Sequence, residues 1–269
     1  MRTSLVGGID VGTRRIRAVA FDCSTRKVLA REAKGKEEVL ELIRFLKGIG
    51  VEKLCVAGGL QWRELNGIEI YRDPVSLLGS ERDIGTHGFR KLISSSIFKE
   101  VVILPSGGAS GEVPIWNLFN AVDSGTPDKV AKCNYLINSE GLSDFTLIDD
   151  GCFTSILKVN DKAITFVLGS TRGVPGRCTP GCIDSEIFIA FKWPQRKKDL
   201  LECGAPREVV EGWIRFLKPV LGDTIIYSSE LDEWSAAIGS ALWCCGTKPK
   251  NFFSDTPRYF CDTLKALMR

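Results

Sequence analysis

The sequence lacks any long apolar run and any strongly charged segment. No stretch approaches the roughly 20 apolar residues that a membrane-spanning helix needs, and the N-terminal residues MRTSLVGGIDVG reach glycines before an export signal could form a hydrophobic core. The 36 basic and 33 acidic residues leave a net charge of +3, so nothing points to a nucleic acid or a membrane surface as partner. We expect a cytoplasmic protein.

Metal-binding cysteine motifs are also missing. Ten cysteines are scattered at irregular spacing, and the only close pairs are Cys178-x₃-Cys182 and Cys244-Cys245. Neither pair forms the CxxC knuckles of a structural zinc site, and no tight motif for an iron–sulfur cluster is present. We interpret the cysteines as buried thiols. Disulfides between distant cysteines remain an alternative if the source is a hyperthermophile, where intracellular disulfides occur, but the sequence does not assign their pairing.

Two common nucleotide-binding motifs are absent as well. The chain contains no GxxxxGK[ST] phosphate loop, and the run Gly7-Gly8-Ile9-Asp10-Val11-Gly12 does not have the spacing of a dinucleotide fingerprint. The sequence therefore excludes a P-loop fold and a Rossmann fold.

What the sequence does contain is a strand, turn, strand, strand pattern that occurs twice. Alternating apolar residues predict strands in the first half at 5–10, 15–21 and 27–31, and in the second half at 145–149, 154–159 and 163–168. A turn joins the first two strands of each set, and Asn160-Asp161-Lys162 is typical of a hairpin turn. The pattern indicates two similar halves.

The remaining segments extend both halves. Apolar spacing predicts strands at 53–57, 100–104 and 224–227, and helices at 37–47, 89–97, 127–137, 183–191, 207–217, 235–242 and 257–268. The Gly, Ser and Pro cluster at 105–114 is the best candidate for a domain boundary. We expect one domain at 1–114 and a second at 115–269, with the last helix packing back on the first.

The two turns carry side chains that suit a nucleoside triphosphate. A glycine lets backbone N–H groups approach phosphate oxygens, an aspartate can hold Mg²⁺, and a threonine hydroxyl can donate to phosphate. These residues are Asp10, Gly12 and Thr13 in the first half and Asp149, Gly151 and Thr154 in the second. One such turn is usually only a turn. Two facing turns would clamp ATP, with Asp10 and Asp149 as the Mg²⁺ ligands.

These motifs also carry a resemblance to a known superfamily. Gly8-Ile9-Asp10-Val11-Gly12-Thr13 resembles the first phosphate motif of the acetate and sugar kinase, heat-shock chaperone and actin superfamily, and Asp149-x-Gly151-x-x-Thr154 resembles the second. Residues 224–242 are similar to its adenosine motif, which places Ser228 and Ser229 beside the nucleotide. The resemblance implies an α/β fold with a two-lobed, duplicated ribonuclease-H-like (actin-like ATPase) architecture and an interlobe nucleotide cleft.

Three further segments narrow the resemblance to an archaeal family of predicted butyrate kinases. They are Asp123-Ser124-Gly125-Thr126-Pro127-Asp128-Lys129, residues 169–176 and residues 181–186. By this resemblance, Asp123 and Asp128 could orient an acceptor or act as general base, although Asp128 would also suit an N-cap. Lys129 and Arg172 could neutralise a transferring phosphoryl group, and Arg14 could pair with phosphate; ordinary surface charge is the alternative for each.

Two observations bear on the class of protein. The single histidine, His87, cannot supply the histidine pair with which the tRNA-threonylcarbamoyl-transferase branch of the superfamily binds its metal. In addition, Cys152 and Phe153 replace small residues in the second turn, Asp150 adds a charge beside it, and serines stand at 228–229 where glycine would let the backbone approach the nucleotide.

The resemblance implies an ATP- and Mg²⁺-dependent phosphotransferase acting on a small molecule, such as a short-chain carboxylate. An ionised carboxylate needs no general base, whereas an alcohol acceptor would. The departures favour an alternative, a non-catalytic or weakly hydrolysing ATP-binding protein that switches a protein partner. A third reading, an ATPase that activates a redox enzyme through a cysteine-held cluster, lacks a suitable motif, and a homodimer is left open.

Overall fold

In a computed structural model, the chain forms two β-sheets that are separated and covered by helices. The structure describes residues 5–12, 15–35, 38–58, 98–114, 117, 125–169, 173–181 and 202–252. The predicted helices at 89–97, 183–191 and 257–268 lie outside these ranges. Within them, no helix is both long and apolar enough to cross a membrane.

The first sheet has the strand order β3-β2-β1-β4-β5. Its strands are β1 (Leu5–Val11), β2 (Ile16–Asp22), β3 (Lys27–Lys34), β4 (Lys53–Ala57) and β5 (Glu100–Ile103). β1 pairs antiparallel with β2 and parallel with β4, and helix α1 (Val39–Gly48) makes the crossover between β3 and β4. These elements confirm the predicted ones, with β3 three residues longer than its pattern indicated.

The second sheet has the order β8-β7-β6-β9. It consists of β6 (Phe145–Asp150), β7 (Thr154–Asn160), β8 (Ala163–Leu168) and β9 (Ile225–Tyr227). β6 pairs antiparallel with β7 and parallel with β9, as β1 does with β2 and β4. The predicted hairpin turn is confirmed: Asp161 and Lys162 both have positive φ, 46° and 65°, as a two-residue type I′ turn requires.

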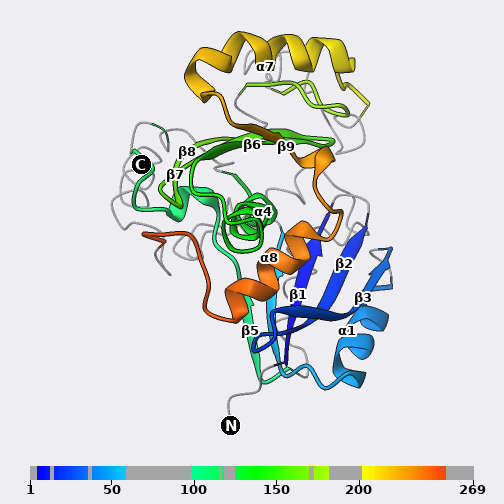
Figure 1. Ribbon diagram of the computed structural model, residues 1–269. Coiled ribbons are helices and arrows are strands. Elements are labelled where there is room, and N and C mark those ends of the chain that lie inside the picture. Colours follow the sequence, from blue (N-terminus) through cyan, green and yellow to red (C-terminus); the bar gives the residue numbers. More distant parts are fainter. Residues whose placement is uncertain are drawn as a thin grey trace, which may run out of the picture.

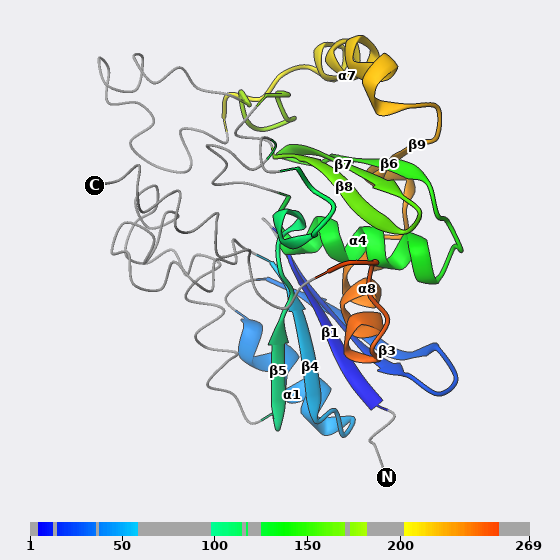
Figure 2. The ribbon, with the colours of Figure 1, turned by 90° about the vertical axis from the view of Figure 1, so that its left-hand side faces the viewer.

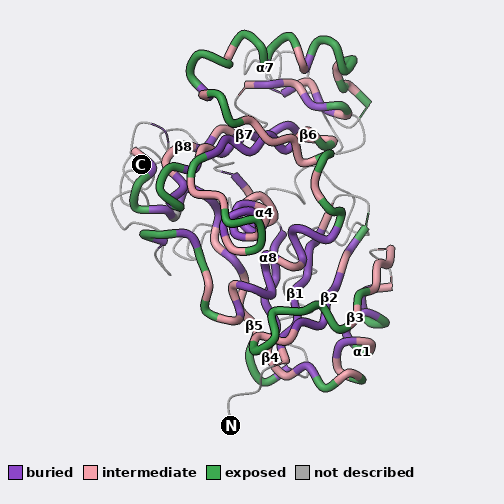
Figure 3. Tube along the Cα trace, in the orientation of Figure 1, coloured by how far each residue is buried: buried purple, intermediate pink, exposed green. Residues whose placement is uncertain are grey.

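The molecule is a stack of layers (Figures 1 and 2). Helix α7 (Arg207–Leu221) covers the outer face of the second sheet, and α4 (Pro127–Asn138) covers its inner face. Helix α8 (Ser235–Cys244) lies between α4 and the inner face of the first sheet, whose outer face carries α1. The interior helices α4 and α8 are the buried centre of the molecule in Figure 3.

Small residues make this central layer possible. A Cβ on Gly239 of α8 would lie 1.8 Å from the carbonyl oxygen of Ala131 in α4, and a Cβ on Gly8 of β1 would lie 2.0 Å from the carbonyl oxygen of Ala237. Helix and strand backbones therefore approach α8 from two sides, which only residues without side chains allow. The small-residue helix predicted at 235–242 is the joint between the two sheets.

Disulfides tie this joint to the first sheet, so the interpretation of the cysteines as buried thiols is wrong for six of the ten. Cys244 and Cys245 at the end of α8 bond to Cys55 in β4 and Cys23 in the turn after β2, with Cα–Cα distances of 5.7 and 5.4 Å. Partners 189 and 222 residues apart in sequence have no local signal by which they could be recognised. Cys133 is a buried thiol, as predicted.

Candidate functional site

Asp10 and Asp149 end the central strands of the two sheets and meet the same group of charges on α4. Asp149 accepts a hydrogen bond from Lys132 through Oδ1, and its Oδ2 lies 3.2 Å from Nζ of Lys129. Asp10 forms an ion pair of 3.4 Å with Arg17 and is within electrostatic range of Lys132 and Lys129. We call these residues, with Asp128, the charge cluster. It lies where α4 passes between the two sheets.

The two aspartates are equally buried but differ in acidity. Burial raises the pKa of Asp10 to about 6, and the neighbouring Asp128 adds to this effect, so that Arg17 and the two lysines compensate it only in part. Burial would also raise the pKa of Asp149, but the adjacent ammonium groups of Lys132 and Lys129 hold it well below its ordinary value. The two lysines therefore favour the charged form of Asp149, whereas Asp10 keeps its proton to a higher pH.

Lys132 was missed in the sequence analysis. Burial alone would lower the pKa of Lys132, but the carboxylates of Asp149 and Asp128 raise it above its ordinary value. Lys129 and Lys132 are three residues apart, so both side chains project from one face of α4. This spacing could have identified Lys132 from the sequence. Lys132 lies one helical turn after Lys129, a candidate phosphate-binding residue, so on a predicted helix both side chains reach the same region.

The start of α4 fixes Asp128. Thr126 is the N-cap residue and Pro127 occupies the first helical position, so the predicted N-cap role of Asp128 is wrong. The Asp128 carboxylate instead accepts a hydrogen bond of 2.6 Å from Thr126 Oγ1 and one of 2.7 Å from Lys129 Nζ. Both of its oxygens are engaged.

Asp150 points to the opposite face of the second sheet, as strand alternation predicts. Its neighbour Ile148 packs under α7, whereas Leu147 packs against α4 on the side of Asp149. The Asp150 carboxylate accepts hydrogen bonds from both predicted serines: 3.0 Å from Ser228 Oγ, 2.9 Å from the Ser229 backbone N–H and 2.7 Å from Ser229 Oγ. The 3₁₀ turn η6 (Ser228–Glu230) is thus fixed to the end of β6.

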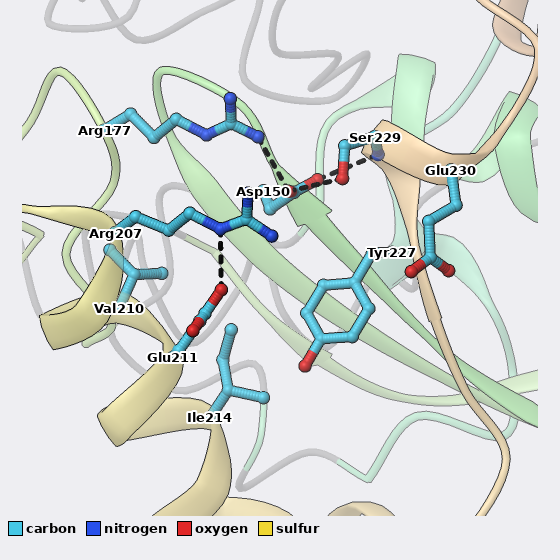
Figure 4. A pocket seen from close by; sticks show the side chains of 9 residues that line it. All are labelled: Asp150, Arg177, Arg207, Val210, Glu211, Ile214, Tyr227, Ser229 and Glu230. Atoms are coloured by element: carbon cyan, nitrogen blue, oxygen red, sulfur yellow. Dashed lines mark hydrogen bonds and ion pairs between the residues drawn. The ribbon is translucent and has the colours of Figure 1, made fainter.

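A pocket of about 160 Å³ opens beside Asp150, between η6 and α7 (Figure 4). The ring of Tyr227, the apolar side chains of Val210 and Ile214, and the Arg207–Glu211 ion pair of 2.6 Å form its walls. Its volume is below the roughly 300–1,000 Å³ of typical small-molecule pockets. It can therefore take one ring system rather than a whole nucleotide.

The second predicted turn, residues 151–153, is bound to the loop at 173–181. Cys152 forms a disulfide with Cys178, and the Arg177 and Cys178 N–H groups donate to the carbonyls of Gly151 and Cys152. Arg177 also pairs with Asp150 at 2.8 Å. A Cβ on Gly151 would meet no atom of the described residues closer than 3.8 Å, so these residues leave space above it. At Gly12 in the first turn, a Cβ would meet the Arg15 carbonyl oxygen at 2.8 Å, and glycine is required there.

Two buried polar atoms have no hydrogen-bond partner among the described residues: Thr154 Oγ1 and Arg17 Nε. Arg17 Nε lies 3.6 Å from a Glu233 oxygen, which is an ion pair but not a hydrogen bond. Thr154 is 1% exposed and sits at the start of β7, directly after the second turn. An orphaned buried hydroxyl is costly in a folded protein and calls for an explanation.

The structure thus brings four sequence candidates together in the charge cluster: Asp10, Asp128, Lys129 and Asp149. A second group surrounds the end of β6: Gly151 follows the strand, Thr154 begins β7 on one side of it, and Ser228 and Ser229 follow β9 on the other side. Thr13, Arg14, Asp123 and Arg172 lie outside the described residues, as does His87. Besides Lys132, the sequence analysis missed Arg17, Arg177 and Tyr227. The roles predicted for the candidates stay predictions.

Comparison with known proteins gives one family and several similar folds. The model of a family described as "Protein of unknown function (DUF1464)" matches residues 8–215. No curated protein matches the sequence.

Three solved structures illustrate the similar folds. A propionate kinase from Francisella tularensis is 13% identical with a TM-score of 0.47, over 75% of this chain and 69% of that one. An inorganic polyphosphate/ATP-glucomannokinase from Arthrobacter sp. strain KM is 12% identical with a TM-score of 0.45, over 89% and 98%. The activator of 2-hydroxyisocaproyl-CoA dehydratase from Clostridium difficile, with bound ADPNP, is 12% identical with a TM-score of 0.39, over 97% of each chain. At these values the likenesses carry no information on activity.

Proposed function

Because the chain belongs to the family described as "Protein of unknown function (DUF1464)", its activity has to be inferred from its own residues, and we propose that it is an ATP-binding phosphotransferase. In this proposal the two sheets are the duplicated lobes of an actin-like ATPase architecture, one formed by residues 1–114 and the other by 115–269, and the phosphates of the nucleotide lie between them, at the ends of β1 and β6.

One observation carries the proposal. β1 and β6 hold the same place in their sheets, and the aspartates at their ends approach the same two lysines of α4. A strand that ends in aspartate and glycine is a common turn, but two that converge on one cationic group form a site for a strongly anionic ligand. The phosphates of ATP have the charge and the length to reach both turns.

The orphaned hydroxyl and the pocket support a position for the nucleotide. Among the described residues, Thr154 Oγ1 is a buried donor without a partner and no atom lies within 3.8 Å of a Cβ added at Gly151, so a phosphate oxygen beside this turn would satisfy the hydroxyl. The pocket at Tyr227 has the volume for a base, with an aromatic ring and two aliphatic side chains as walls.

Mg²⁺ is the cation that the sequence resemblance implies, and the side chains around Asp149 do not fit it. Both Asp149 oxygens are engaged by ammonium groups, and Asp10 is paired with Arg17. Across the described ranges, no group of three or more His, Cys, Asp or Glu side chains is arranged to hold a metal ion. We therefore do not carry the Mg²⁺ roles of Asp10 and Asp149 into the proposal.

For the acceptor, the state of Asp128 favours a short-chain carboxylate over an alcohol. An alcohol must lose a proton to a general base; of the two candidates, Asp128 has both oxygens engaged by Thr126 and Lys129, and Asp123 lies outside the described residues. A carboxylate is already ionised at neutral pH and needs only positioning and charge neutralisation. This agrees with the resemblance to predicted butyrate kinases.

The second candidate function is a non-catalytic ATP-binding protein that switches a protein partner. The disulfide-bound second turn favours it, because Cys152–Cys178 and the hydrogen bonds to the 173–181 loop hold this turn in one conformation. A rigid turn is suited to binding the phosphates of ATP. It is less suited to catalysis, in which the turn would have to move with the phosphoryl group during its transfer.

The experiment is an assay of phosphoryl transfer that measures the ADP released. Purified protein is incubated with ATP and, in parallel, acetate, propionate, butyrate or glucose, and acyl phosphate is trapped as the hydroxamate. We expect ADP formation that depends on one of the carboxylates. Saturable ATP binding without transfer to any acceptor would support the second candidate, and absence of ATP binding would refute both.

A further inference from the structure

In the charge cluster, lysine side chains occupy the place beside Asp149 where a metal cation would bind. The side chain of Asp149, at the end of β6, is only 7% exposed. Its carboxylate forms ion pairs with two ammonium groups, Lys132 at Oδ1 and Lys129 at Oδ2. Mg²⁺ requires oxygen ligands at 2.0–2.1 Å in octahedral geometry and usually keeps several waters. A buried carboxylate whose two oxygens are already paired with ammonium groups offers neither the ligands nor the space.

The charge of the two lysines equals that of the cation they exclude. Two ammonium groups bring the two positive charges of one divalent cation to Asp149, and with Asp128 included the two lysines and the two carboxylates are together neutral. Asp128 shares Lys129 at 2.7 Å, and Asp10 has its own partner in Arg17. An anionic ligand at this point would approach the ammonium groups of Lys129 and Lys132 and the guanidinium of Arg17.

The two ammonium groups are also fixed in position. Lys129 and Lys132 project from one face of α4, with side chains 12% and 19% exposed. α4 itself is anchored to α8, since its Asn134 side chain donates to the carbonyl oxygens of Gly239 and Thr247. Preorganised cations cost little reorganisation when an anion binds.

We infer that Lys129 and Lys132 take the place of the divalent cation at Asp149, so that this chain binds the polyphosphate of a nucleotide without Mg²⁺. The inference rests on the proposed function, since it specifies how the proposed ATP site neutralises the phosphates. It makes Lys132 a ligand-binding residue that the sequence motifs do not include.

The test is calorimetric titration of the full chain with ATP, once in EDTA and once in excess Mg²⁺. We expect the two dissociation constants to agree within about threefold. In Lys132→Met, which keeps the length of the side chain and removes the charge, we expect at least a tenfold loss of affinity in EDTA. Mg²⁺ should restore part of that loss, because one Asp149 oxygen is then released. Lys132→Arg should retain binding in EDTA.

The matched control is Lys250→Met. Lys250 also pairs with an aspartate of the second sheet, Asp161 at 2.7 Å, but at the opposite end of the β6–β7 pair from Asp149. Lys250→Met should bind ATP with the wild-type affinity both in EDTA and in Mg²⁺. Binding by the wild type only in Mg²⁺, or unchanged binding in EDTA by a folded Lys132→Met, would overturn the inference and leave the proposed function intact. Absence of binding in both buffers would instead refute the proposed function. If Lys132→Met does not fold, Lys129→Met serves, with the same expected loss in EDTA.

Discussion

Two buried aspartates at matching ends of two sheets differ in charge because their partners differ. Asp149 has two ammonium groups in contact, whereas Asp10 has one guanidinium at 3.4 Å and a like charge, Asp128, nearby. A buried carboxyl is ionised only where its neighbours compensate the lost hydration. The acidity of each residue is thus set by side chains that other elements bring to it, α4 in the case of Asp149 and β2 and α4 in the case of Asp10.

Asp10→Asn should therefore stabilise the protein at neutral and alkaline pH. The pKa of Asp10 in the folded chain, about 6, is above its ordinary value of 3.8, so ionisation lowers the free energy of unfolding progressively as pH rises from about 4 to about 6. Removing this cost should gain at most about 3 kcal/mol above pH 6 and almost nothing at pH 4. Urea unfolding of both proteins at pH 4 and pH 8 measures it. An equal difference at the two pH values would contradict the assignment.

Thr154→Val tests the orphaned hydroxyl. Valine has the same shape, and Thr154 Oγ1 has no partner to lose among the described residues. The free energy of unfolding should stay the same or rise by about 1 kcal/mol, while ATP affinity should fall about tenfold, because the donor to phosphate is gone. Thermal unfolding and calorimetric titration check the two parts. A variant that loses stability and keeps its affinity would show that the hydroxyl serves the fold.

At the scale of elements, α8 decides how the two sheets meet. Its sequence is short, apolar all round and rich in Ala, Gly and Ser, and all but two of its ten residues are buried. A helix of this composition is buried on every side. It fits because β1 and α4 also present small residues, Gly8 and Ala131, at the points of contact.

Gly239→Ala should accordingly be strongly destabilising, although alanine is the better helix former. The added Cβ would lie 1.8 Å from the Ala131 carbonyl oxygen, so α4 and α8 must separate. We expect a loss of at least about 2 kcal/mol. Gly212→Ala in α7 is the matched control, since no atom of the described residues lies within 4 Å of its added Cβ, and it should gain about 0.5–1 kcal/mol. Urea unfolding measures both, and a neutral Gly239→Ala would contradict the close packing.

At the scale of the whole molecule, disulfides join segments that are distant in the chain. Cys23–Cys245 and Cys55–Cys244 close loops over most of the sequence and attach α8 to the first sheet. Such bonds occur in oxidising compartments and inside hyperthermophiles. Cys133 is chemically inert by comparison, because burial raises the pKa of its thiol.

Reduction should lower the stability of the protein. Removing a native disulfide typically costs about 2–5 kcal/mol, so urea unfolding with and without a phosphine reductant should differ by at least that amount. Mass spectrometry of non-reduced peptides should recover the Cys23–Cys245 link. Cys23→Ser combined with Cys245→Ser is the control, and its response to reductant should be smaller. Equal stability in both buffers would show that these cysteines are thiols in solution.

The sequence by itself determined the elements and their repetition. Alternation and helical spacing are local properties, so the strands of both sheets, α1, α4 and α8 were predicted within a few residues. α7 extends to Leu221, four residues beyond its predicted end, because the inward face of the helix continues past Lys218. Alternation also separated Asp149 from Asp150, since successive side chains of a strand face opposite ways.

Only the tertiary structure decided which side chains share the site. Lys132 and Arg17 come to the two aspartates through the packing of α4 and the pairing of β1 with β2, and neither belongs to a motif. The disulfides Cys23–Cys245 and Cys55–Cys244 and the contact of Gly239 with α4 join residues more than 100 positions apart. A local pattern cannot encode such proximity, because it depends on how whole elements pack. The same packing sets the pKa values, and with them the charge that a nucleotide would meet.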